Sequence, residues 1–164
     1  MARTIIGVLG PGETARPLDC QRARDLGALI AAQSWVLLTG GRPAGVMAAA
    51  QAGAQAAGGL TLGILPGDDP AAADPAVDLV LCTALGQGRN NVNVLSAQVV
   101  IACGMGFGTA SEVALALKQG RPVVLLDERW EAYHFFQGLG AQRLVAVTTA
   151  TAAIAQTRQW LAAR

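Results

Sequence analysis

The sequence predicts an α/β fold in which a doubly wound, Rossmann-like parallel sheet is flanked by helices. Short apolar runs of strand length alternate with longer stretches rich in Ala and Leu, which is the pattern of βαβ units. Hydrophobic residues make up 52% of the chain and aromatic residues only 4%, so the interior is expected to be small and aliphatic. With 164 residues, the chain is expected to form a single ligand-binding domain, residues 1–164.

Five apolar runs predict strands, and two weaker runs are further candidates. Because the runs are continuously apolar, we expect helices to cover both faces of the sheet. The clear runs are residues 4–9, 35–39, 60–65, 99–103 and 123–126, and the weaker ones are 79–82 and 144–147.

Six stretches between these runs have helical length and composition. The stretch 109–119 is apolar over most of its circumference and stops at Gly120, so we expect it to be the most buried helix. The loop-like stretch 66–75 either covers a site or merely connects two strands. The predicted helices are residues 18–33, 46–57, 91–97, 109–119, 130–137 and 152–163.

Charge and cysteine content limit the classes of partner. A net charge of +1 leaves no basic surplus for a nucleic-acid backbone or a membrane surface. Only 14% of residues are charged, and such a weakly polar surface favours a homo-oligomer, a dimer or a tetramer. Cys20, Cys82 and Cys103 lack a metal-binding spacing and suit a reducing compartment. We therefore expect a cytoplasmic protein without a metal site, and an N-terminal run too short for a signal segment.

Glycine-rich turns follow three predicted strands at their carboxyl ends. In an open parallel sheet the binding crevice lies at that edge, where helix N-termini also offer unpaired N–H groups. Three such turns together predict a site for a phosphate-bearing small molecule. The candidates are Gly10 and Gly12; Gly40, Gly41, Arg42 and Gly45; and Gly104, Met105, Gly106, Phe107, Gly108 and Thr109.

The three turns lack the motifs of two common nucleotide sites. None continues into Gly-Lys-Ser/Thr, and none is a full Gly-x-Gly-x-x-Gly fingerprint. The sequence therefore disfavours ATP hydrolysis and ordinary NAD chemistry.

Arginine side chains are candidate partners for an anionic group. Arg89, followed by Asn90, lies at the start of a short predicted helix, where its guanidinium can fork onto a phosphate. The alternative is a surface arginine in a flexible loop. The same two interpretations apply to Arg42.

Glu112 also has two interpretations. Thr109-x-x-Glu112 at a predicted helix start matches a capping box, in which both side chains satisfy backbone donors. A carboxylate beside an anion-binding turn can instead hydrogen-bond a ligand hydroxyl or act on a sugar. The residue types alone leave both open.

Two segments together resemble a known superfamily. Leu38-Thr39-Gly40-Gly41-Arg42 and the stretch from Gly104 to Lys118 resemble proteins long mislabelled lysine decarboxylases, which include cytokinin-activating phosphoribohydrolases. Their turn reads Pro-Gly-Gly-x-Gly-Thr-x-x-Glu. This chain keeps Gly106, Gly108, Thr109 and Glu112, but has Gly104 for Pro and Met105 for Gly. Arg89, 15 positions before Gly104, falls where the hydrolases carry a catalytic Arg.

Within that superfamily the chain most resembles molybdenum cofactor carrier proteins, over nearly its whole length. The turn Gly-Met-Gly-x-Gly-Thr-Ala-x-Glu and the following Val-Ala-Leu-Ala-Leu-Lys helix carry this likeness. It implies a homo-oligomer that shields an oxygen-sensitive pterin bearing a phosphate and dithiolene-bound molybdenum. The metal travels on the cofactor, so no protein metal ligand is implied, and a molybdoenzyme is a candidate recipient.

Two other functions remain open at this point. The same pocket suits a nucleoside 5′-monophosphate phosphoribohydrolase in which Arg89 and Glu112 are catalytic. It also suits a module that binds a nucleotide-like ligand without cleaving it.

Overall fold

The computed structural model describes residues 3–163 and contains one seven-stranded parallel sheet. The strand order is β4-β3-β2-β1-β5-β6-β7. The strands are β1 (Ile5–Leu9), β2 (Val36–Thr39), β3 (Thr61–Leu65), β4 (Leu79–Cys82), β5 (Val99–Cys103), β6 (Val123–Leu126) and β7 (Leu144–Val147).

The order of the strands reverses at β1. From β1 the chain adds β2, β3 and β4 in one direction, and it then returns to place β5, β6 and β7 on the other side. The loops that leave the carboxyl ends of β1 and β5 consequently run in different directions. This reversal is the switch point at which doubly wound sheets form their binding crevice.

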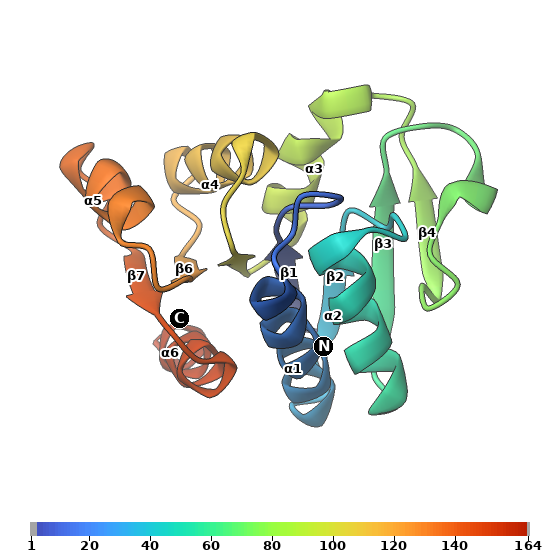
Figure 1. The fold of residues 1–164 in the computed structure, drawn as a ribbon, viewed down its shortest axis with the longest axis horizontal. Coiled ribbons are helices and arrows are strands. Elements are labelled where there is room, and N and C mark those ends of the chain that lie inside the picture. Colours follow the sequence, from blue (N-terminus) through green and yellow to red (C-terminus); the bar gives the residue numbers. More distant parts are fainter. Residues whose placement is uncertain (1–2, 164) are drawn as a thin grey trace.

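Six helices cover the two faces of the sheet (Figure 1). Helices α1, α2 and α6 pack on one face over a core that includes Ile6 and Ile101. Helices α3, α4 and α5 cover the other face over a core that includes Val100 and Phe136. The helices are α1 (Pro17–Ala32), α2 (Gly45–Ala56), α3 (Arg89–Ser96), α4 (Phe107–Lys118), α5 (Glu131–Gly138) and α6 (Ala150–Ala162).

The predicted α/β class and its elements are confirmed. All seven predicted strands exist with bounds within one residue, and the six helices lie within two residues of their predicted bounds. The alternation of apolar runs with Ala- and Leu-rich stretches is sufficient to predict these elements, because the hydrophobic periodicity of a strand differs strongly from that of a helix.

Two predictions about burial are wrong. The edge strand β4 is not covered on both faces, since Leu79 and Leu81 are about half exposed (50% and 51%). The connection from β3 to β4 holds only the short 3₁₀ turn η1 (Pro70–Ala72), beside β4, where other connections supply a covering helix (Figure 1). Helix α4 is not the most buried helix either: four of its twelve residues are buried, against six of twelve in α2.

Candidate functional site

A cavity of about 250 Å³ opens at the carboxyl edge of the sheet, beside the switch point. Its walls come from the turns after β1, β2 and β5 together with the start of α3. The glycine turns and the upstream arginine, far apart in the sequence, therefore border one space. The predicted residues that line it are Gly10, Gly12, Gly40, Arg42, Arg89, Asn90, Gly106, Phe107, Gly108, Thr109 and Glu112.

Four predicted residues do not line the cavity. Gly41, Gly45 and Gly104 have φ angles of 75°, 49° and 74°, in the left-handed region that favours glycine, so they shape the turns. Met105 is partly buried and packs against the core beneath α4. We expected these residues at the ligand because they belong to the same motifs. In the structure these four residues instead support the turns and the core next to the cavity.

The first turn of α4 forms one wall of the cavity. The helix begins at Phe107 after the extended N-cap Gly106, and residues 106–109 all line the cavity. N–H groups in a first helical turn have no acceptor within the helix, and the helix dipole is positive there. This wall is therefore suited to an anionic group such as phosphate.

The capping-box interpretation of Glu112 is wrong. Because α4 begins two residues earlier than predicted, Thr109 lies inside the first turn and Glu112 in the second. The carboxylate of Glu112 instead accepts a hydrogen bond from Asn93 Nδ2 on α3, at 3.1 Å. Glu112 is thus free of any backbone-capping task and belongs to the cavity wall.

Burial determines the ionisation of Glu112. The residue is 8% exposed, and its partner Asn93 is 1% exposed. Burial raises the pKa of Glu112 to about 7, and this effect outweighs the hydrogen bond from Asn93 and the charge of Arg89. Near neutral pH the carboxyl group consequently exists in both the acid and the carboxylate form.

Arg89 is not a surface arginine in a flexible loop. It is the first residue of α3, and its Nη1 donates to the carbonyl oxygens of Gly40, at 2.5 Å, and Ile64. Gly40 directly follows β2 and Ile64 is the penultimate residue of β3, so the guanidinium ties two strand ends to α3. A Cβ on Gly40 would clash with Nη1, so Gly40 makes room for Arg89.

The rest of the Arg89 guanidinium has capacity for a ligand. Within residues 3–163, its Nε and Nη2 have no protein acceptor. Burial lowers the pKa of Arg89, and the nearby Glu112 opposes this shift. Unshared N–H donors on a partly buried cation can bind a phosphate or a related anion.

Asn90 and Arg42 border the cavity from two sides. Asn90 is buried, and its Nδ2 donates to Ser111 Oγ at 3.2 Å, which joins α3 to α4. Arg42 pairs with Glu13 near the solvent, with side chains 42% and 71% exposed. Glu13 is a lining residue that the sequence does not predict, although it directly follows Gly10-Pro11-Gly12. Pro66 also lines the cavity, at the start of the stretch 66–75 that connects β3 to β4.

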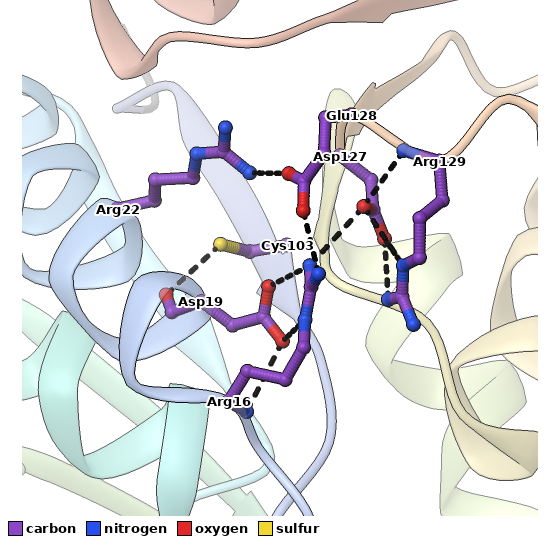
Figure 2. Close-up of polar contacts among 7 residues, drawn as sticks. All are labelled: Arg16, Asp19, Arg22, Cys103, Asp127, Glu128 and Arg129. Atoms are coloured by element: carbon purple, nitrogen blue, oxygen red, sulfur yellow. Dashed lines mark hydrogen bonds and ion pairs between the residues drawn. The ribbon is translucent and has the colours of Figure 1, made fainter.

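A second polar cluster, which we call the loop clasp, lies at the same edge of the sheet between the start of α1 and the loop after β6. Figure 2 shows the Arg16 guanidinium between Asp19 on one side and Asp127 and Glu128 on the other. Its Nη2 lies 2.6 Å from Asp19 Oδ1 and 3.1 Å from Asp127 Oδ1. The clasp comprises Arg16, Asp19, Arg22, Asp127, Glu128 and Arg129.

The charges of the loop clasp satisfy one another. Hydrogen bonds from Arg22 and Arg16 lower the pKa of Glu128 to about 2. Burial opposes the ionisation of Asp127, but Arg129 and Arg16 outweigh it and keep the pKa of Asp127 below its usual range. Cys103 Sγ donates to the backbone oxygen of Asp19, at 3.2 Å, and is fully buried. The clasp therefore joins loops and leaves no unshared charge for a ligand.

Two absences hold for residues 3–163. They include no cluster of three or more His, Cys, Asp or Glu side chains that could hold a metal ion. Among the same residues, no helix combines the length and the apolar character needed to cross a bilayer.

Comparison with known proteins identifies relatives over almost the whole chain. The model of the SLOG cluster4 family matches residues 3–154. An uncharacterized protein of Archaeoglobus fulgidus is 41% identical over 121 residues, which are 74% of this chain and 78% of that protein.

Two solved structures share both fold and sequence with the chain. A molybdenum cofactor binding protein from the phototrophic bacterium Rippkaea orientalis is 48% identical, with a TM-score of 0.96 and coverage of 98% of this chain and 99% of that one. The molybdenum cofactor carrier protein of Chlamydomonas reinhardtii is 47% identical, with a TM-score of 0.93 and the same coverage.

Proposed function

Since this chain belongs to the SLOG cluster4 family, we propose that it binds, carries and protects molybdenum cofactor. The observation that carries the proposal is the identity of 47–48%, over nearly the full length, with proteins described as binding or carrying this cofactor. Such similarity at this coverage extends through the turns that build the cavity.

The cavity has the chemistry that the cofactor requires. The first turn of α4 offers backbone donors to the phosphate of the pterin. Arg89, which lines the same cavity as Glu112, adds a guanidinium with unshared N–H groups. Molybdenum is held by the dithiolene of the cofactor itself, so the protein needs to supply only binding and burial.

Oligomeric state, location and partners are further parts of the proposal. The half-exposed Leu79 and Leu81 on β4 support a homo-oligomer, because apolar edge strands are commonly covered by another chain. A cytoplasmic location agrees with the unpaired cysteines. A carrier also requires a recipient, for which an apo-molybdoenzyme is the natural chemical class.

The two alternatives are not favoured. The similar solved structures are of proteins that bind or carry molybdenum cofactor. The phosphoribohydrolase and nucleotide-module interpretations rest only on the resemblance to the wider superfamily. Incubation with AMP tests both alternatives. A cofactor carrier should neither cleave AMP to adenine nor retain AMP in the cavity in preference to the cofactor.

The proposal is tested by anaerobic loading of the purified chain with molybdenum cofactor, followed by gel filtration and a timed exposure to air. We expect the cofactor to co-elute with the protein and to oxidise more slowly than free cofactor. Arg89→Ala should lose much of this protection, while Arg158→Ala, a matched change at an exposed position of α6, should keep it. Failure of the wild-type chain to retain or protect the cofactor would contradict the proposal.

A further inference from the structure

Glu112 is an acidic side chain in the wall of an anion-binding cavity. It lines the same space as the first turn of α4 and Arg89, the two features suited to an anion. An ionised carboxylate at this position would repel an incoming anion. The placement needs an explanation beyond helix capping, which the start of α4 at Phe107 excludes.

The surroundings of Glu112 do not solvate a full negative charge. The side chain is 8% exposed, and among residues 3–163 it receives one side-chain hydrogen bond, from Asn93 Nδ2 to Oε1. Within the same residues it makes no ion pair. A buried carboxylate with one donor is poorly stabilised, whereas a carboxylic acid in this position needs only an acceptor for its O–H.

The charged groups around Glu112 come from three elements. Arg89 of α3 is the cation whose charge acts on it, and two carbonyl oxygens already share the Nη1 of this guanidinium. Across the cavity, Arg42 and Glu13 neutralise each other at the solvent edge. On its own helix, Glu112 lies in the second turn, beyond the first-turn N–H groups. Burial therefore prevails over these groups, and it raises the pKa of Glu112 to about 7.

From this geometry we propose that Glu112 is a specificity-determining residue that, as a neutral carboxylic acid, donates a hydrogen bond to an oxygen of the anionic ligand. Because Asn93 occupies Oε1, the proton is assigned to Oε2. The anion and one proton from solvent consequently bind together, and no covalent bond forms or breaks. The inference rests on the proposed function for the ligand, and it assigns Glu112 the role of donor.

Proton-coupled binding gives the site two properties. It selects anions that carry an oxygen acceptor facing α4, since only these can accept the Glu112 proton. It also releases such anions as the pH rises, because the acid form becomes scarcer and must be regenerated at each binding event.

Sulfate is the probe for the test, because its charge does not change between pH 6 and pH 9. Calorimetric titration of the full chain should give a dissociation constant that is nearly constant below pH 6.5. Above pH 7 it should increase about tenfold per pH unit, the slope for uptake of one proton. Titrations at pH 8 in two buffers of different ionisation enthalpy should report close to one proton taken up per sulfate.

Two variants separate a donor from a structural residue. Glu112→Gln keeps the shape and an N–H donor, so it should bind sulfate with similar affinity at pH 6 and lose the pH dependence. Glu131→Gln, an exposed change at the first residue of α5, should retain the wild-type pH profile. Circular dichroism at each pH establishes that both variants are folded.

Several results would overturn the inference. These are a wild-type affinity for sulfate that does not change with pH, a pH dependence that persists in Glu112→Gln, or the absence of sulfate binding at pH 6. Retention of molybdenum cofactor by the wild-type chain at pH 6 tests the proposed function separately, since it does not depend on which group carries the proton.

Discussion

The cavity and the loop clasp contain the same kinds of side chain at the same edge of the sheet, yet they differ in how completely their charges are paired. In the clasp, Arg16 makes ion pairs with three carboxylates. In the cavity, Arg89 and Glu112 make no ion pair with each other among the described residues, and each is partly or largely buried. Paired charges stabilise loops, while incompletely paired charges are available to a ligand.

The largest effect should come from opening the clasp. Asp19→Ala removes a carboxylate that is 1% exposed and that accepts from both the side chain and the backbone N–H of Arg16. We expect the free energy of unfolding to fall by about 4 kcal/mol, the cost of removing the buried partner of an ion pair whose other side chain, Arg16, is 33% exposed. Urea denaturation measures this change. Asp25→Ala, at an exposed position of the same helix, is the control, and an equal loss in both variants would refute the distinction.

Removing the acid from the cavity should have the opposite effect on stability. The pKa of Glu112 is raised from 4.5 to about 7, so between these values the folded state binds more protons than the unfolded state. Stability therefore falls as the pH rises through this window and levels off above it. Glu112→Gln avoids this loss and should be more stable than wild type at pH 9, by on the order of 3 kcal/mol.

The control for that prediction is the same comparison at pH 5, where wild type is protonated at Glu112. The two proteins should differ little in thermal and urea unfolding at this pH. A variant that is less stable than wild type at pH 9 would show that the ionised carboxylate is well solvated in the folded state.

The two regions also differ in how far their sequences predict them. The cavity was foreseeable because its glycine turns follow strands whose order fixes their common edge. The clasp was not, since Arg16 and Asp127 are 111 positions apart and no local pattern joins them. The start of α4 was misplaced because Thr109-x-x-Glu112 imitates a capping box, whereas the true N-cap, Gly106, has no side chain to signal it.

The exposure of β4 could not be predicted from the sequence for a similar reason. The run 79–82 is typical of a buried strand, but within residues 3–163 the connection before it supplies no helix to cover Leu79 and Leu81. Burial of an edge strand depends on tertiary structure, which an apolar run does not encode by itself.

A smaller effect, measured on binding, is expected at Arg89. Arg89→Ala removes charge-assisted hydrogen bonds to the ligand, and the loss of one such bond costs about 1.5–3 kcal/mol, so sulfate affinity should fall by at least roughly 10- to 100-fold. Arg89→Lys should recover part of it, because it keeps the charge but loses the planar fork. Titration calorimetry at pH 6 measures both, and unchanged affinity in Arg89→Ala would place the anion elsewhere.

The smallest effect should follow from the exposed pair of the cavity. Arg42→Ala breaks an ion pair whose side chains are 42% and 71% exposed, and such pairs contribute less than about 1 kcal/mol to stability. The urea midpoint should hardly change. A fall in the free energy of unfolding as large as that of Asp19→Ala would mean that solvent exposure does not determine how much an ion pair contributes to stability.

The most direct test of the account is an anaerobic crystal structure of the chain loaded with molybdenum cofactor. We predict that the phosphate lies within hydrogen-bond distance of the first-turn N–H groups of α4, and that an anionic oxygen of the cofactor faces Arg89 and Glu112. The loop clasp should keep the ion pairs of Figure 2 unchanged. A cofactor bound at the clasp, or at any place away from the cavity, would contradict the assignment of the site.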